Sequence, residues 1–65
     1  MTVADFEKVC NLNQTLVFKR LNKKEMNAEV VRVIPGSTLY LAKELFSKNI
    51  ISFNDNSGII EIWIE

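Results

Sequence analysis

The sequence predicts a single α+β domain over residues 1–65, ordered as helix, hairpin, helix and hairpin. Apolar residues recur at helical spacing in two short segments, near residues 3–10 and 39–46. Each segment is followed by a pair of strand-like apolar runs, and the last run, residues 59–65, alternates cleanly. We therefore expect an αββαββ fold with a four-stranded, largely antiparallel sheet and two short helices on one face. A β-grasp-like fold with an added N-terminal helix has the same order of elements and is the alternative.

Size and composition exclude several classes of protein. Chains below about 70–80 residues usually need a disulfide, a metal or a second subunit to supplement a small core. This chain has 65 residues, one cysteine and no histidine, so an intrachain disulfide and a classical zinc site are excluded and either self-association or marginal stability remains. The eight basic and eight acidic residues cancel, so no net field attracts nucleic acid. No apolar run approaches the roughly 20 residues of a membrane span, and the N-terminus does not resemble a signal peptide. We expect a cytoplasmic protein without a membrane partner.

The first helix is expected to begin at Thr2, which can cap the N-terminus while Asp5 completes a capping box. An apolar stripe at helical spacing follows, made of Val3, Phe6, Val9 and Cys10. Cys10 is interpreted as a small core residue rather than a reactive thiol, because free cysteine is commonly buried and no cationic partner adjoins it.

The first hairpin is predicted from the apolar runs 16–21 and 29–34, connected by residues 22–27. The connection lacks glycine, so its turn type stays open, and Met26 can belong to the turn or to the second strand. Basic side chains cluster in this hairpin: Lys19, Arg20, Lys23, Lys24 and Arg32. They can form a phosphate-binding patch, or a solvated turn whose lysines discourage edge-to-edge pairing. Balanced charge and the lack of interleaved aromatic residues favour the solvated turn.

Residues 35–38 interrupt the second strand and begin the second helix, since proline and glycine break strands and Ser37 or Thr38 can act as the cap. The apolar arc of this helix consists of Leu39, Leu41, Ala42, Leu45 and Phe46. Tyr40 falls on the polar side. It is either a contact residue for a partner or a single exposed aromatic with its hydroxyl in water.

The terminal hairpin is predicted from residues 50–53, a polar loop at 54–58 and the strand 59–65. The alternate isoleucines are expected to face the helices and to form one core with other large side chains. That core is Ile60, Ile62, Ile64, Phe53, Phe6, Leu41, Leu45 and Phe46.

Trp63 then belongs to the opposite, open face of the sheet, with Ile59 and either Val17 or Ile34 nearby. An apolar patch there would be a subunit or partner surface. Alternatively, Trp63 packs against the long stems of lysine or arginine on neighbouring strands. The C-terminal strand is apolar enough that it could pair with another chain.

Enzyme chemistry has little support. Without histidine, triads and dyads that need an imidazole base are excluded, and two glycines match no phosphate-binding loop. The turn at residues 54–58 has one carboxylate and a glycine one place early for a calcium loop. We expect a non-enzyme with no catalytic residue, no cofactor and no metal site.

The hydrophobic pattern of the chain resembles that of many tiny accessory proteins carried by phages and mobile elements of Gram-positive bacteria. The resemblance rests on Val3-x-x-Phe6-x-x-Val9, Leu16-Val17-Phe18, residues 30–34, Ile50-Ile51-Ser52-Phe53 and Ile59-Ile60-Glu61-Ile62. The first hairpin departs from the usual pattern because its turn has no glycine. The resemblance implies a cytoplasmic protein that binds a host or defence protein, for example as its inhibitor. It implies no functional residues.

The function predicted from the sequence is a non-enzymatic protein-interaction module, homodimeric, that contacts a protein partner through Trp63, Tyr40 and Ile59. The alternative is a small nucleic-acid-binding module that uses the basic first hairpin. Binding by that hairpin would weaken steeply with added salt.

Overall fold

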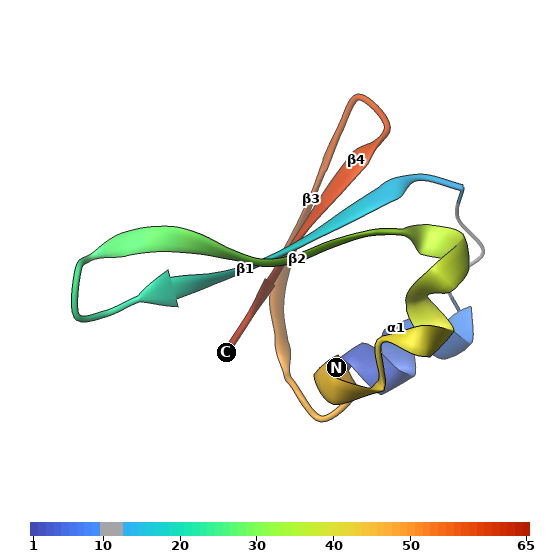
Figure 1. The fold of residues 1–65 in the computed structure, drawn as a ribbon, viewed down its shortest axis with the longest axis horizontal. Coiled ribbons are helices and arrows are strands. Elements are labelled where there is room, and N and C mark those ends of the chain that lie inside the picture. The colour runs from blue at the N-terminus through green and yellow to red at the C-terminus, as the bar shows by residue number, and fades with distance from the viewer. Residues whose placement is uncertain (10–12) are drawn as a thin grey trace.

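The computed structural model describes residues 1–9 and 13–65. It contains one α-helix, two 3₁₀ segments and four strands, arranged as a sheet with the helical segments against one face (Figure 1). The elements are α1 (Val3–Val9), β1 (Thr15–Asn22), β2 (Asn27–Pro35), η1 (Gly36–Leu41), η2 (Lys43–Leu45), β3 (Ile50–Asn56) and β4 (Ile59–Ile64). The predicted small α+β architecture and its order of elements are confirmed.

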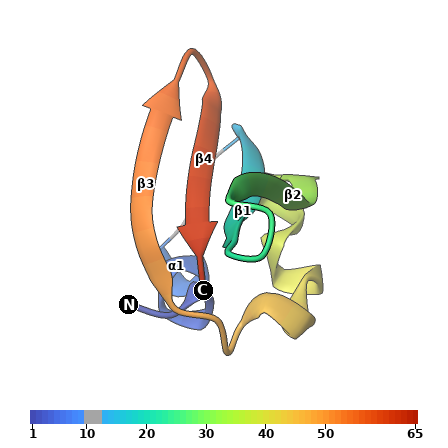
Figure 2. The ribbon, with the colours of Figure 1, turned by 90° about the vertical axis from the view of Figure 1, so that its left-hand side faces the viewer.

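The strands lie in the order β2-β1-β4-β3. Each hairpin is antiparallel, and the two hairpins join through a parallel pair formed by β1 and β4. Figure 2 shows β4 with β3 on one side and β1 on the other. The prediction that the C-terminal strand could pair with another chain is therefore wrong, because both of its edges are occupied within the sheet. The outer strands are β2 and β3.

Helix α1 begins with the predicted capping box. The Thr2 N–H donates to Asp5 Oδ2 at 3.1 Å, and the Asp5 N–H donates to Thr2 Oγ1 at 3.3 Å. The bond from the Thr2 N–H to the carboxylate above all, and then the Thr2 side chain, lower the pKa of Asp5, so the ionised carboxylate stabilises the helix above the ordinary carboxyl pKa and this effect is lost as the pH falls through the lowered pKa. Of the apolar stripe, Val3 and Phe6 are buried, whereas Val9 is 72% exposed. Cys10 lies outside the described residues.

The predicted second α-helix is replaced by η1 and η2, which are separated at Ala42 (φ −90°, ψ 53°). A 3₁₀ helix has three residues per turn, so side chains three apart share a face. Leu39, Ala42 and Leu45 follow this spacing and are all buried. Leu41 does not, and it is 61% exposed, so its predicted place in the core is wrong.

The core lies between the helical segments and the isoleucine face of the sheet. Its buried members are Val3, Phe6, Leu16, Phe18, Ile34, Leu39, Ala42, Leu45, Ile60, Ile62 and Ile64, with Phe46 and Ile50 packed against them. Phe53 was expected in this set but is 47% exposed. It stands opposite Ile62 on the outer strand β3, where it has only one neighbouring strand, and its ring contacts that of Phe6 with centroids 5.3 Å apart.

Both hairpin turns are defined by residues with positive φ. In the first turn the Asn22 side chain accepts hydrogen bonds from the Lys24 and Glu25 N–H groups, and Met26 (φ 55°) belongs to the turn rather than to β2. The second turn is shorter than the predicted loop, because residues 54–56 continue β3 and only Ser57 (φ 53°) and Gly58 (φ 85°) connect the strands. Two positive φ values are what a type I′ hairpin requires.

Replacing Gly58 with alanine should lower the free energy of unfolding by about 1–2 kcal/mol, because an L-residue is strained in the left-handed region. A Cβ at this position would meet no atom within 4 Å, so the loss is a backbone effect and involves no steric clash. Urea titration followed by circular dichroism measures it. The control is Ser57→Ala, at a position that already holds a side chain at positive φ; equal losses in the two variants would contradict this explanation.

Candidate interaction surface

The sheet has an open face, which we define by the residues that point away from the helical segments. Residues paired across neighbouring strands point to the same side of a sheet, so the register identifies them. Read from β2 through β1 and β4 to β3, the three rows are Pro35–Thr15–Ile59–Asn56, Val33–Val17–Glu61–Asn54 and Val30–Lys19–Trp63–Ser52. The predicted placement of Trp63 and Ile59 agrees with this register. Of the two expected neighbours, Val17 lies on the open face, whereas Ile34 is buried in the core.

The open face is apolar on one side and polar on the other. The residues of strand β3 that are paired on this face are Ser52, Asn54 and Asn56. The other strands contribute exposed apolar side chains, namely Val30 (57% exposed), Val33 (56%) and Ile59 (44%). Isolated exposed apolar residues are normal on a protein surface, but a contiguous group is typical of an interaction site. Val30 and Val33 were not predicted from the sequence as site residues. A β-bulge at Val31 interrupts the two-residue alternation of β2, so the sequence alone does not show that both valines face the same side.

Trp63 packs against a lysine of the neighbouring strand, as one of the two interpretations expected, and its role as a partner surface stays a prediction. It is half-buried on the open face, and the Lys19 Nζ lies 5.8 Å from the centroid of its ring. The same Nζ is 3.5 Å from Glu61 Oε1, so the lysine is held between a carboxylate and an aromatic ring. A partner that contacts the tryptophan would therefore meet a side chain whose position is already restricted.

Tyr40 is 57% exposed, but it belongs to η1 rather than to the sheet. The helical segments cover the core face, so Tyr40 is not on the open face with Trp63 and Ile59. The structure thus brings two of the three predicted contact residues onto one surface and places the third on another element.

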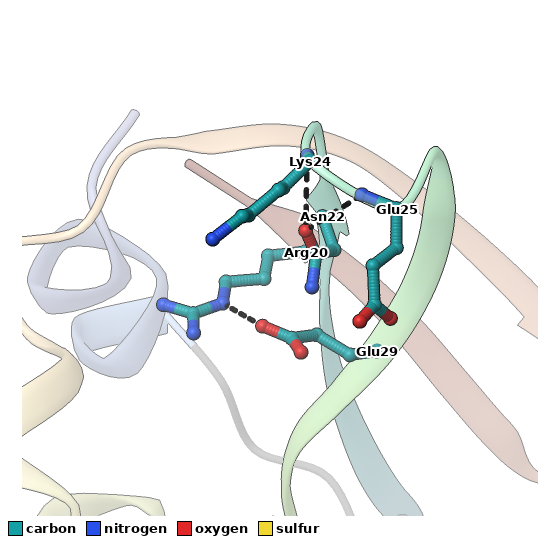
Figure 3. A network of polar contacts seen from close by, with 5 residues as sticks. All are labelled: Arg20, Asn22, Lys24, Glu25 and Glu29. Carbon is teal, nitrogen blue, oxygen red and sulfur yellow. Dashed lines mark hydrogen bonds and ion pairs between the residues drawn. The ribbon is translucent and has the colours of Figure 1, made fainter.

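The predicted basic patch is divided by ion pairs. Lys19 pairs with Glu61, Arg20 with Glu29 and Arg32 with Glu44. Figure 3 shows the Arg20 side chain directed at Glu29, with Lys24 and Glu25 in the adjoining turn.

The basic residues also lie on different sides of the sheet. Lys19 is on the open face, and Arg20 follows it directly in the strand, so Arg20 points to the other side. Arg32 faces the same side as buried Phe18. Lys19 therefore lies on the opposite side of the sheet from Arg20 and Arg32.

A small hollow of about 280 Å³ lies near the far end of the first hairpin. It is lined by Arg20, Leu21, Lys23, Ile51, Ile64 and Glu65. Ligand pockets usually measure about 300–1,000 Å³, so this hollow is at the lower limit for a small molecule.

Among residues 1–9 and 13–65, no group of three or more metal-ligating side chains could hold a metal ion. In the same part of the chain, none of the helices has the length and apolar character needed to cross a membrane. The chain matches no protein-family model, no curated protein and no solved structure. The resemblance to phage and mobile-element proteins stays a prediction.

Proposed function

We propose that this chain is a small, non-enzymatic protein-interaction module that binds an apolar surface of another protein through the open face of its sheet. The observation that carries the proposal is the group of exposed apolar side chains on that face, Val30, Val33 and Ile59, beside the half-buried Trp63. Tryptophan is enriched among the residues that contribute most to binding at protein–protein interfaces.

Charge supports a protein partner over a nucleic acid. The formal net charge is zero, and Lys19, Arg20 and Arg32 each have a carboxylate partner within the chain. Nucleic-acid affinity arises mainly from cations that neutralise phosphates, and these three cations are already neutralised locally. The nucleic-acid alternative therefore has less support than it had from the sequence.

The resemblance of the hydrophobic pattern suggests the kind of partner. We propose a cytoplasmic host or defence protein of a bacterium, bound and occluded by this chain. This part of the proposal rests on the resemblance alone.

The test compares tagged wild-type chain with Ile59→Lys and Val9→Lys in affinity purification from the native cell after nuclease treatment. Ile59 is 44% exposed on the open face, and Val9 is 72% exposed at the end of α1, so both changes add a charge at an exposed apolar position. Co-purifying proteins are identified by mass spectrometry, and binding is repeated with the purified components.

We expect one protein at near-stoichiometric amount with the wild type and with Val9→Lys, and its loss with Ile59→Lys. Retention by all three baits would exclude the open face as the binding surface. A wild-type eluate that contains only the bait would refute a stable heterologous partner under those conditions.

A further inference from the structure

The two outer strands differ in how their edges are covered. The start of β3 is paired on its outer side by the N-terminus, since Thr2 bridges Asn49 and the Ile50 N–H donates to the Met1 carbonyl at 2.8 Å. Beyond that point β3 has two exposed apolar residues, Ile51 and Phe53, among four polar ones, whereas β2 presents three exposed valines, Val30, Val31 and Val33. An apolar outer strand can add a strand from another chain to its sheet. In Figure 1 the far part of the β1–β2 hairpin extends away from the helical segments, which leaves room for one.

A β-bulge at Val31 gives β2 an unusual pattern of faces. Arg32 pairs with Phe18 and Val30 pairs with Lys19, so the extra residue between them is Val31. Glu29 and Arg32 point to the core side, whereas Val30 pairs with Lys19 on the open side. Because two residues of a β-bulge stand opposite one residue of the partner strand, we place the unpaired Val31 on the open side as well. The segment Glu29-Val30-Val31-Arg32 therefore has the face order core, open, open, core, which reads the same in both directions.

This symmetry identifies the occupant of the edge. When two copies of β2 run antiparallel about an axis between Val30 and Val31, each Glu29 lies opposite Arg32 of the second copy, on the same side of the sheet. Each Val30 lies opposite Val31 of the second copy on the open side. A register shifted by one residue in either direction would centre on Val30 or Val31 and leave Glu29 and Arg32 opposite uncharged residues, which loses the charge pairs and disfavours it.

We propose that a second copy of this chain pairs with β2 in that register, which joins the two sheets into one continuous sheet with a two-fold axis. Such an isologous contact uses the same patch on both copies. It places Val30 and Val31 of the two copies next to each other on the open face and adds two Glu29–Arg32 contacts. The existing pairs of Glu29 with Arg20 and of Arg32 with Glu44 do not prevent this, because a carboxylate accepts on both oxygens and a guanidinium has five donors. The inference concerns the edge of the sheet and does not depend on the proposed function, which is tested at Ile59.

Charge reversal tests the register. Sedimentation equilibrium of the purified chain, from micromolar to millimolar concentration, compares the wild type with Glu29→Lys, Arg32→Glu and the double variant. We expect a wild-type dimer that is weakened about tenfold or more by either single change, because two opposed pairs become repulsive. The double variant should restore dimerisation, because the exchanged charges at positions 29 and 32 again attract each other between the two copies. The pairs with Arg20 and Glu44 stay broken in it.

Asp55→Lys, a charge reversal on the outer strand β3, is the matched control and should leave dimerisation unchanged. Circular dichroism establishes that each variant is folded. A wild type that is monomeric at all concentrations overturns the proposal, and so does equal dimerisation in the single variants or its loss in the double variant.

Amide hydrogen exchange on the wild type requires no variant. Protection that rises with protein concentration should be confined to β2. Concentration-dependent protection on another element, with none on β2, would refute pairing at this edge.

Discussion

Replacing Phe18 with alanine is expected to unfold most of the population at room temperature. The side chain is fully buried at the centre of the sheet, between Ile62 on β4 and the bulged part of β2. Truncating a buried phenylalanine typically costs about 3–5 kcal/mol. In a chain below about 70–80 residues a single core rarely supplies more than about 3–5 kcal/mol, so that loss removes most of the stability. Urea titration monitored by circular dichroism measures the effect.

Phe53→Ala is the matched control, because it removes the same atoms from a position that is 47% exposed. It keeps the Phe6 contact from forming but leaves the buried core intact, so we expect a loss well below that of Phe18→Ala. Comparable losses at the two positions would contradict the assignment of the core.

Replacing Trp63 with alanine is expected to weaken binding of the protein partner by about 30-fold or more while the chain stays folded. Truncation of a tryptophan at the centre of an interface typically costs at least about 2 kcal/mol. The fold should persist because Trp63 is half-buried and points away from the isoleucine core. Isothermal titration calorimetry with the identified partner measures the affinity.

Tyr40→Ala is the aromatic control. Because Tyr40 lies on η1 and not on the open face, a partner bound to the open face should tolerate its loss. If Tyr40→Ala lowers the affinity for the partner strongly and Trp63→Ala lowers it only slightly, the partner binds the helical segments rather than the open face.

The parts of the fold that local patterns specify could be predicted from the sequence. The capping box of Thr2 and Asp5 requires only two residues three apart, and the alternation of residues 59–65 requires only the two-residue period of a strand. The second helix was mispredicted because Leu39, Ala42 and Leu45 fit an α-helix and a 3₁₀ helix equally well. Only Leu41 distinguishes the two, and in the structure it faces solvent.

Features that depend on pairing between distant segments could not be predicted. Nothing in the sequence shows that β4 lies between β1 and β3, because strand order is decided by how the whole isoleucine face is covered. The bulge at Val31 is likewise visible only in the register of β2 against β1.

The sequence could predict the part of the candidate site that lies on a single strand, but not the part that depends on pairing between strands. The placement of Trp63 and Ile59 on one face follows from alternation within a single strand. The contribution of Val30 and Val33 required the register.

The most direct test of the central proposal is nuclear magnetic resonance of the isotope-labelled chain, recorded before and after addition of the partner found by affinity purification. Binding through the open face predicts amide shift changes that are largest at Val17, Ile59 and Trp63, with little change along α1 and η1. Changes concentrated on α1, η1 and η2, with the open face unaffected, would contradict it.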